Sequence, residues 1–466
     1  MAEPYSVSTA RVRIIFLLYF TYLCYYLARK ADAITKSSLQ SDKGFTLDDL
    51  AFADTCYLGT YTLALFGSGM VGARVPSNVM LFIGLIGVAA CSFLKSQASS
   101  PMAFAVLQVL HAIFQSTGWP TCIKVLATWV NKNRGFIMGL WTTCQSLGGV
   151  AGTIGGTWFL TRYGWTTSYT YHVPILFVMA VIDLFFIMDE PPFEWKDYFI
   201  PEDIAPKSTD SKESGSGTEN KPNEDEGKAS TSTGNGTISL SQVIALPGVL
   251  AVGTSYFFLK FMRYALLFWL PFYYEKELKY SRGLAGYIST SFELGGTIGT
   301  PLIGYISDKY MKGKRDLTSG LFMSGAAITL TLCILLSQWG PLVNAFCMAL
   351  TGILVIGPDS VLSGTIAQDI GQSSGLGKAA VGSVAGLLNS MGSAGSIFQS
   401  GATAYISRAY GWNALFLVFV ACASLSAGIL FHIASKSLPP GVTLIMRISS
   451  LLFGPGRLTN SLSLEE

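Results

Sequence analysis

Four basic residues lie inside long apolar stretches of this sequence, in two pairs. Arg29 and Lys30 close the first apolar stretch, and Lys260 and Arg263 lie within a later one. A charge at the centre of a bilayer costs about 3 kcal/mol or more, and it persists where it faces a cavity or a partner. Two guanidinium groups that face each other can each donate a bidentate hydrogen bond to a phosphate. If the two stretches meet in the fold, these residues predict a site for a doubly charged phosphate.

Each pair also has a plainer interpretation. Arg29 and Lys30 could extend along the apolar surface and place their charges at the membrane interface. Arg263 has no acidic residue within one helical turn. Either an anionic ligand or a carboxylate distant in the sequence must therefore neutralise it, and both alternatives stay open at this point.

The composition predicts a membrane protein. Half of the 466 residues are hydrophobic, 13% are charged, and the mean hydropathy is +0.45, a balance that cannot coat a soluble globule. The 49 glycines suit helices that pack closely in lipid. All eight cysteines fall within apolar runs, so we expect buried packing residues and no disulfide framework. The net charge of +3 identifies no partner, because the placement of the charges carries the information.

Apolar segments of spanning length form two sets of six. They centre near residues 22, 60, 86, 112, 147 and 178, and then near 260, 294, 325, 352, 392 and 421. The first segment ends in YYLARK and lacks a small-residue cleavage site, so we expect it to be retained as a span. We predict an all-α membrane protein with twelve transmembrane helices. Its parts are a six-helix bundle at 1–189, a disordered linker at 190–239, a second bundle at 240–435 and a tail at 436–466.

Basic residues in the short loops predict the orientation. Most of them precede the first span or follow an even number of spans, so they lie on the same side of the membrane. These residues are Arg11, Arg13, Lys132, Arg134, Lys309, Lys312, Lys314, Arg315 and Lys436. The positive-inside rule makes that side cytoplasmic, together with both termini and the linker. Lys276, Lys279 and Arg282 oppose the trend. We expect a multi-pass protein of the endoplasmic reticulum or another endomembrane, in preference to the plasma membrane.

The two halves repeat one another. QSLGG at 145–149 and RYGW at 162–165 are echoed by NSMGS at 389–393 and AYGW at 409–412. A parallel repeat places equivalent helices around a central axis, with the substrate site between the halves near mid-membrane. We therefore expect Gln145 and Asn389 to be partners across the axis, and Arg29 and Arg263 to converge.

Several motifs resemble the organophosphate:phosphate antiporters of the major facilitator superfamily. They are YYLARK at 25–30, TGWP at 117–120, RGFIMGLW at 134–141, RY at 263–264 with WLP at 269–271, and GP at 357–358. The likeness covers nearly the whole chain outside the linker and tail. It is nearest to the eukaryotic glycerol-3-phosphate and glucose-6-phosphate exchangers. The resemblance implies the major facilitator fold of two six-helix bundles and exchange of a phosphate ester for inorganic phosphate.

The resemblance also implies roles for particular residues. In that family an arginine of the first span and a basic residue of the seventh hold the phosphate, which corresponds to Arg29 and Arg263 here. Lys30 matches the lysine of the family's RK pair, and Lys260 stands in the place of the lysine of the sugar-phosphate branch. Because the chain has both Lys260 and Arg263, the choice of sugar stays open. Gln145 replaces a substrate-contacting histidine of the bacterial glycerol-3-phosphate member, so a protonation role is absent and hydrogen bonding remains.

The gating motif of the superfamily is complete in one half only. The first copy, Gly72-Ala73-Arg74, lacks its aspartate, whereas the second contains Asp308, Lys309 and Arg315. We predict gating contacts for Asp308, Lys309, Arg315 and Arg134 on the cytoplasmic face, with the two halves contributing unequally.

Other polar residues give weaker signals. Lys124 could line the cytoplasmic half of the cavity or extend to the interface. Tyr26 could donate to the phosphate from one turn before Arg29. Glu293 and Asp54 could pair with cavity cations. His111 and His172 have no metal-ligand spacing, and a satisfied polar or interfacial role suits them better.

These observations lead to one mechanism and two alternatives. We expect alternating access, in which the bundles rock around a phosphate held by Arg29 and Arg263, with Gln145 and Asn389 available to the organic moiety. The alternatives are a facilitator or proton symporter of another organic anion, and a transporter-like receptor of a phosphometabolite. We expect no enzymatic activity, cofactor, metal or nucleic-acid partner, and a monomer in the lipid bilayer.

Overall fold

The computed structural model describes residues 5–72, 74–130, 134–192, 240–373 and 378–436. Within these ranges the regular structure is helical throughout. The predicted linker lies almost wholly outside the described residues, as does the predicted tail beyond Lys436.

The amino-terminal half forms six rods. They are α1 (Tyr5–Arg29) continued by α2 (Ala31–Lys43), α3 (Leu47–Gly72), α4 (Ser77–Gln97), α5 (Pro101–Gln115) continued by α6 (Gly118–Trp129), α7 (Arg134–Tyr163), and α8 (Trp165–Thr170) continued by α9 (Val173–Phe186). The first rod bends at Lys30, beside the cations of interest.

The carboxy-terminal half begins with the short α10 (Leu240–Ile244) and also forms six rods. They are α11 (Val249–Lys276), α12 (Arg282–Lys309), α13 (Arg315–Leu335), α14 (Pro341–Ser360) continued through a π-helical turn (Val361–Thr365) into α15 (Ile366–Ser373), and the two arms of α16 (Lys378–Lys436), which meet at Gly411. A 3₁₀ turn at Ser337–Trp339 precedes α14.

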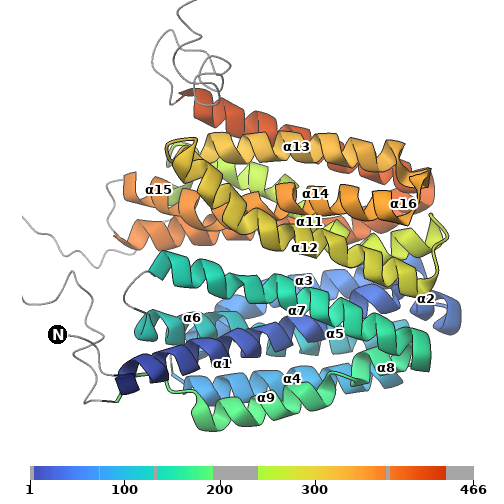
Figure 1. Cartoon of the computed structure of the whole chain (residues 1–466), viewed down its shortest axis with the longest axis horizontal. Coiled ribbons are helices and arrows are strands. Elements are labelled where there is room, and N and C mark those ends of the chain that lie inside the picture. Colours follow the sequence, from blue (N-terminus) through green and yellow to red (C-terminus); the bar gives the residue numbers. More distant parts are fainter. Residues whose placement is uncertain (1–4, 73, 131–133, 193–239, 374–377, 437–466) are drawn as a thin grey trace, which may run out of the picture.

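The rods lie side by side along the long axis, with the amino-terminal half below and the carboxy-terminal half above in Figure 1. Contacts between the halves join α7 to α12, α3 to α16 and α2 to α11. We call the end that carries residues 192 and 240 the linker end, and the end where α2 turns into α3 the far end.

The repeated YGW motif has the same backbone role in both halves. Gly164 (φ 94°, ψ 172°) and Gly411 (φ 83°, ψ 170°) each combine a positive φ with an extended ψ, a conformation that a residue with a Cβ rarely occupies. The following Trp165 and Trp412 are both buried at 8% exposure. The motif therefore makes a sharp corner between consecutive rods at the far end, once in each half.

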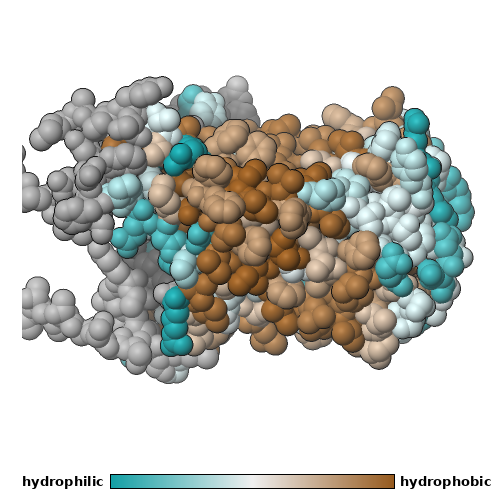
Figure 2. Space-filling model, turned by 90° about the horizontal axis from the view of Figure 1, so that it is seen from below, coloured by the Kyte–Doolittle hydropathy of each residue, from teal (hydrophilic) through white to brown (hydrophobic). Residues whose placement is uncertain are grey.

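On the face seen in Figure 2, apolar side chains cover the middle of the molecule, and hydrophilic side chains gather toward its two ends. By length and composition alone, six helical stretches among the described residues are apolar enough to cross a membrane. The all-helical arrangement agrees with the predicted fold class.

Two glycines bring α7 against the backbone of α1. A Cβ at Gly148 would lie 2.5 Å from the carbonyl oxygen of Leu23, and one at Gly152 would lie 2.6 Å from that of Leu27. Real Cβ atoms do not approach so closely, so these positions require glycine. This close approach places Gln145, one turn earlier on α7, beside Tyr26 of α1.

Candidate functional site between the two halves

Arg29 ends α1 in the interior of the protein. Its side chain is buried, at 4% exposure, and five aromatic rings surround its guanidinium carbon at 5.3–5.8 Å. The rings belong to Tyr26, Tyr57, Tyr61, Tyr264 and Phe268. Three come from the amino-terminal half and two from the carboxy-terminal half, so Arg29 lies at the contact between the bundles and does not extend to an interface.

The guanidinium of Arg29 has unused donors. Its Nε and Nη2 atoms are buried without a hydrogen-bond partner, and no ion pair of Arg29 occurs among the described residues. Aromatic faces attract the cation but accept few hydrogen bonds. A buried donor without an acceptor is costly, so this arrangement suits an anionic acceptor such as a phosphate oxygen.

Lys30 pairs with Glu293 of α12, across the contact between the halves. The ammonium and carboxylate lie 2.9 Å apart, and both side chains are buried. The structure thus joins the second cation of the RK pair to a carboxylate that the sequence analysis left as one possible partner. The pair links α1 of one bundle to α12 of the other.

Arg263 on α11 forms an ion pair with Asp359 near the end of α14. Of the two alternatives for Arg263, the distant carboxylate is therefore present, 96 positions along the chain. Arg263 still has a buried, unpartnered Nε, and Asp359 has an unpartnered Oδ1. Sequence reasoning missed Asp359, although it directly follows the GP motif at 357–358.

Two hydrogen bonds repeat the same arrangement in each half. Tyr26 donates to Oε1 of Gln145 at 2.9 Å, and Lys260 donates to Oδ1 of Asn389 at 2.8 Å. In each half, the first rod thus donates to the amide of the fifth. The expected partnership of Gln145 with Asn389 across the axis is wrong in this conformation, because each amide is engaged by its own bundle.

A small cavity lies beside Arg29 and Lys30. Its other lining residues are Tyr26, Ala33, Leu267 and Phe268, and its volume is about 10 Å³, which is room for about one water molecule. Walls from α1, α2 and α11 make it a space between the halves. A phosphate ester requires these walls to separate, so binding must move the bundles or their side chains.

Lys124 has a different environment. It donates to the carbonyl oxygen of Gly72 at 3.0 Å and pairs with Asp189 at 3.1 Å, and both charged side chains are about one-third exposed. Burial opposes ionisation of Asp189, but hydrogen bonds from Ser77 and the charge of Lys124 lower its pKa below the usual range. The structure thus places Lys124 in an ion pair at the linker end and not with the cluster around Arg29.

The predicted gating residues also lie at the linker end. Arg315 pairs with Asp369 of α15 at 2.7 Å, and Lys309 donates to the hydroxyl of Tyr305 at 2.6 Å. Asp308 is exposed. α7 begins at Arg134, whose side chain lies outside the described ones. Among the described residues, the polar and cation–π contacts of Arg315 and Lys309 stay within the carboxy-terminal half.

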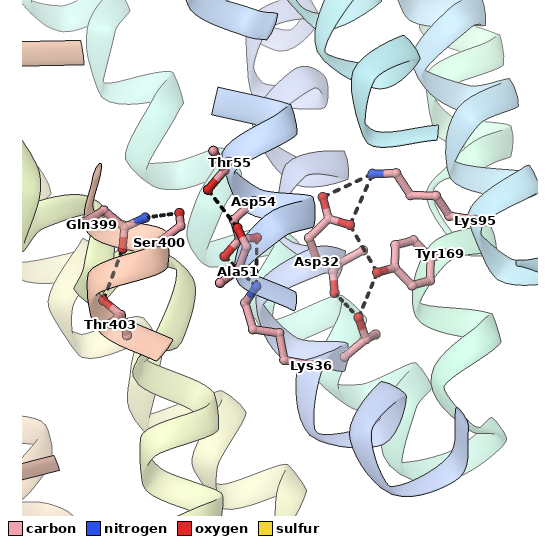
Figure 3. Close-up of polar contacts among 12 residues, drawn as sticks. Asp32, Lys36, Ala51, Asp54, Thr55, Lys95, Tyr169, Gln399, Ser400 and Thr403 are labelled. Carbon is pink, nitrogen blue, oxygen red and sulfur yellow. Dashed lines mark hydrogen bonds and ion pairs between the residues drawn. The ribbon is translucent and has the colours of Figure 1, made fainter. Parts of the chain in front are cut away.

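A buried charge network in the amino-terminal bundle was missed by the sequence analysis. Lys95 of α4 pairs with Asp32 of α2 at 3.1 Å, and Lys36 of α2 pairs with Asp54 of α3 at 2.7 Å (Figure 3). Tyr169 donates to Asp32 at 3.1 Å. The sequence analysis gave Asp54 as a possible partner of a cavity cation, and its partner in the structure is Lys36. The sequence feature that could have revealed this network is the spacing of Asp32 and Lys36, which lie four residues apart and so on one face of a helix.

The two histidines discussed above differ in their contacts. His111 meets Lys95 through Nδ1 at 2.5 Å, whereas both ring nitrogens of His172 are buried without a partner. Among the described residues, no group of three or more potential ligands could hold a metal ion.

Comparison with known proteins identifies similar families and folds. The model of the Major Facilitator Superfamily matches residues 18–400. "Putative glycerol-3-phosphate transporter 2" of Arabidopsis thaliana is 30% identical over 465 residues, covering 95% of this chain and 88% of the relative. "Sugar phosphate exchanger 3" of Bos taurus is 28% identical over 386 residues, with 80% and 77% covered.

A third relative and a solved structure agree with these matches. "Glucose-6-phosphate exchanger SLC37A2" of Xenopus tropicalis is 27% identical over 464 residues, covering 90% of this chain and 92% of the relative. A bacterial homologue of the human lysosomal transporter Spinster, in an inward-facing and occupied conformation, superposes with a TM-score of 0.65. It is 13% identical and covers 93% of this chain and 98% of its own, so it supports the fold alone.

Proposed function

This chain belongs to the Major Facilitator Superfamily, and from that premise we propose that it exchanges an organic phosphate ester for inorganic phosphate by alternating access. It is a multi-pass membrane transporter and not an enzyme. Its relatives are named as transporters of glycerol-3-phosphate and exchangers of sugar phosphates. Glycerol-3-phosphate and hexose phosphates such as glucose-6-phosphate are therefore the organic substrates that we propose.

One observation carries the proposal: Arg29 is a buried guanidinium with unpartnered donors, at the contact between the bundles. The ring of Tyr264 lies 5.5 Å from its guanidinium carbon and 5.8 Å from that of Arg263. Both cations thus face one aromatic ring of α11. A phosphate at this place can accept from both guanidinium groups, as the pseudo-symmetric positions of α1 and α11 favour.

The carboxylates of the site compete with phosphate for the cations, which gives a physical reason for exchange. Asp359 holds Arg263, and Glu293 holds Lys30. An entering phosphate competes with these carboxylates for the cations, and its departure lets the ion pairs form again. Without an anion or these pairs, facing cations repel one another. Either phosphate or the ester can therefore neutralise the site while the bundles reorient, which favours exchange over net transport.

We place the organic moiety beside the two amides. Gln145 and Asn389 each use one carbonyl oxygen within their own bundle, which leaves their NH₂ donors for hydroxyl groups of the ester. Lys260 and Tyr26 hold these amides in position. We do not assign Lys124 to the binding site, because its ion pair with Asp189 lies at the linker end. We place that end on the cytoplasmic side, following the basic loops.

The test is counterflow in proteoliposomes that contain the purified protein. Vesicles loaded with unlabelled phosphate should accumulate labelled phosphate, and glycerol-3-phosphate or glucose-6-phosphate inside should drive the same uptake. Uptake driven by a carboxylate, or by a proton gradient in phosphate-free vesicles, would replace exchange with transport of another organic anion. Binding of phosphate without any flux would favour a receptor.

Gln145→Ala separates the amide from the phosphate clamp. We expect exchange of the ester against phosphate to fall about tenfold, since one or two hydrogen bonds to the organic moiety are lost. Phosphate:phosphate exchange should change less than about threefold. Initial rates in the two assays, normalised to protein in the vesicles, measure the difference, and an equal loss in both would contradict the assignment of Gln145.

Replacing residues 208–232 with a flexible Gly/Ser segment of equal length should leave exchange kinetics within about twofold of wild type. These residues lie outside the described ones, and the prediction rests on their composition, which lacks apolar anchors. About 25 flexible residues reach roughly 25–30 Å on average, which suffices for a tether. A large loss of exchange at normal protein abundance would show that the segment docks on a bundle.

A further inference from the structure

Lys36 lies on α2, two helical turns beyond Arg29 toward the far end. Its side chain is almost completely buried, at 2% exposure for the residue. Neither the phosphate clamp nor the amides use it. A buried cation in a membrane protein requires an explanation, because its desolvation must be offset by fixed partners.

One set of partners fixes Lys36 to its own bundle. The ammonium donates to both carboxylate oxygens of Asp54 on α3 at 2.7 Å (Figure 3). One turn earlier on α2, Asp32 is held by Lys95 of α4, which also donates to Gln108 at 2.7 Å. These buried bonds tie α2 directly to α3 and α4, and through Lys95 to α5, so α2 must move as one body with the amino-terminal bundle.

The remaining contact of Lys36 crosses to the other bundle. Its ammonium lies 4.6 Å from the ring centre of Trp269 and 5.9 Å from that of Phe268, both on α11. Phe268 also lines the small cavity and lies 5.4 Å from the guanidinium carbon of Arg29. Lys36 and Trp269 therefore close the space directly beyond the candidate phosphate site, on its far-end side.

A second layer of contacts between the bundles lies nearer the far end. Arg408 pairs with Asp48, and Arg282 donates to Ser41 at 2.9 Å. Along α2, Ser41 lies about 7.5 Å beyond Lys36, and along α3, Asp48 lies about 9 Å beyond Asp54. The outer contacts are exposed, so water and salt weaken them. The contact between Lys36 and Trp269 is desolvated, which strengthens a cation–π interaction.

We propose that Lys36 and Trp269 form the inner gate of the far-end side, and that their cation–π contact must break before the binding site opens to that side. The inference depends on the proposed rocking of the bundles and not on the identity of the substrate. Because Asp54 keeps Lys36 neutralised on its own bundle, the contact with Trp269 can break without leaving an unpaired buried charge.

Trp269→Leu tests the gate, because it removes the indole face and leaves the ion pair of Lys36 with Asp54 in place. Spin labels attached through unnatural amino acids at Lys43 and Glu277, one on each bundle at the far end, report opening as a longer distance. We expect the population with the far end open to rise at least fivefold in Trp269→Leu, and about twofold in Trp269→Phe, whose ring attracts a cation less strongly.

Trp412→Leu is the matched control. Trp412 is also a buried indole of the carboxy-terminal bundle, but its ring packs on Phe272 and Tyr273 of the same bundle. Its removal should leave the distance distribution unchanged. Should Trp269→Leu fail to fold, the twofold shift in Trp269→Phe decides the question.

Suppose that the wild type shows two distances between the labels and that the Trp269 variants show the same distance distribution. This result would overturn the gate and leave the exchange mechanism intact. A single distance in the wild type, with and without phosphate, would overturn the rocking motion and the gate together. Counterflow of phosphate, measured on the same wild-type preparation, separates that outcome from failure of the proposed function.

Discussion

Arg29→Lys is expected to reduce exchange at least about 100-fold while the protein still reaches the membrane at normal abundance. Lysine keeps the positive charge but loses the planar fork that can donate two parallel hydrogen bonds to a phosphate. Hydrogen bonds to charged groups contribute about 1.5–3 kcal/mol each, and a 100-fold loss corresponds to about 2.7 kcal/mol. The five surrounding rings attract an ammonium as well as a guanidinium, so they keep the charge in place without restoring the fork.

The measurement is the initial rate of phosphate:phosphate exchange in proteoliposomes. Arg162→Lys is the matched control, since Arg162 is exposed at the far end and packs on Trp158. It should exchange at the wild-type rate. Exchange by Arg29→Lys within about threefold of wild type would remove Arg29 from the phosphate clamp and leave its burial unexplained. Arg263→Lys should behave as Arg29→Lys does, because the same fork is lost.

Glu293→Gln is expected to lower both exchange and thermal stability. Removing one partner of a buried ion pair costs about 3–5 kcal/mol, because the other charge stays buried and unpaired. Here the unpaired charge would be Lys30, at 7% exposure. Phosphate can then neutralise Lys30, so added phosphate should raise the melting temperature of Glu293→Gln more than that of wild type.

Lys30→Met/Glu293→Gln separates stability from transport. The double variant has no unpaired charge, so we expect its melting temperature to recover most of the loss while exchange stays low. Thermal unfolding in detergent, with and without phosphate, measures the first effect, and counterflow measures the second. If the single and double variants unfold at the same temperature, the two charges are not coupled.

Two kinds of sequence pattern predicted features of the fold: local apolar patterns and the repeat of the two halves. The spans follow from apolar patterns within about 30 residues, whereas the paired positions of Arg29 and Arg263 follow from comparing one half of the sequence with the other. The apolar patterns persist because every buried backbone group in a bilayer must be satisfied within its own helix, which fixes the length and apolar character of each span. Cations within such apolar spans are rare, so they can be recognised in the sequence as candidates for a function.

The partners of those cations could not be predicted in the same way. The sequence offered Glu293 as a possible partner of a cavity cation without saying which one, and it did not point to Asp359 for Arg263, because both carboxylates lie on helices that the sequence places only by order. Which side chains meet depends on the rotation and depth of each helix, and a rotation of 100° per residue moves a side chain from the cavity to the lipid. The amides illustrate the limit: repeat symmetry predicted that Gln145 and Asn389 would meet, and packing gave each a donor in its own bundle.

The sequence by itself determined a helical membrane protein in two related halves and the cations that mark its centre. Only the tertiary structure showed which carboxylate pairs with each of those cations, and that Arg29 has no such partner among the described residues. It also showed that the ammonium of Lys36 in one bundle contacts the ring of Trp269 in the other. The physical reason is that burial in a span is a property of one helix, whereas the pairing of buried charges is a property of how several helices pack together.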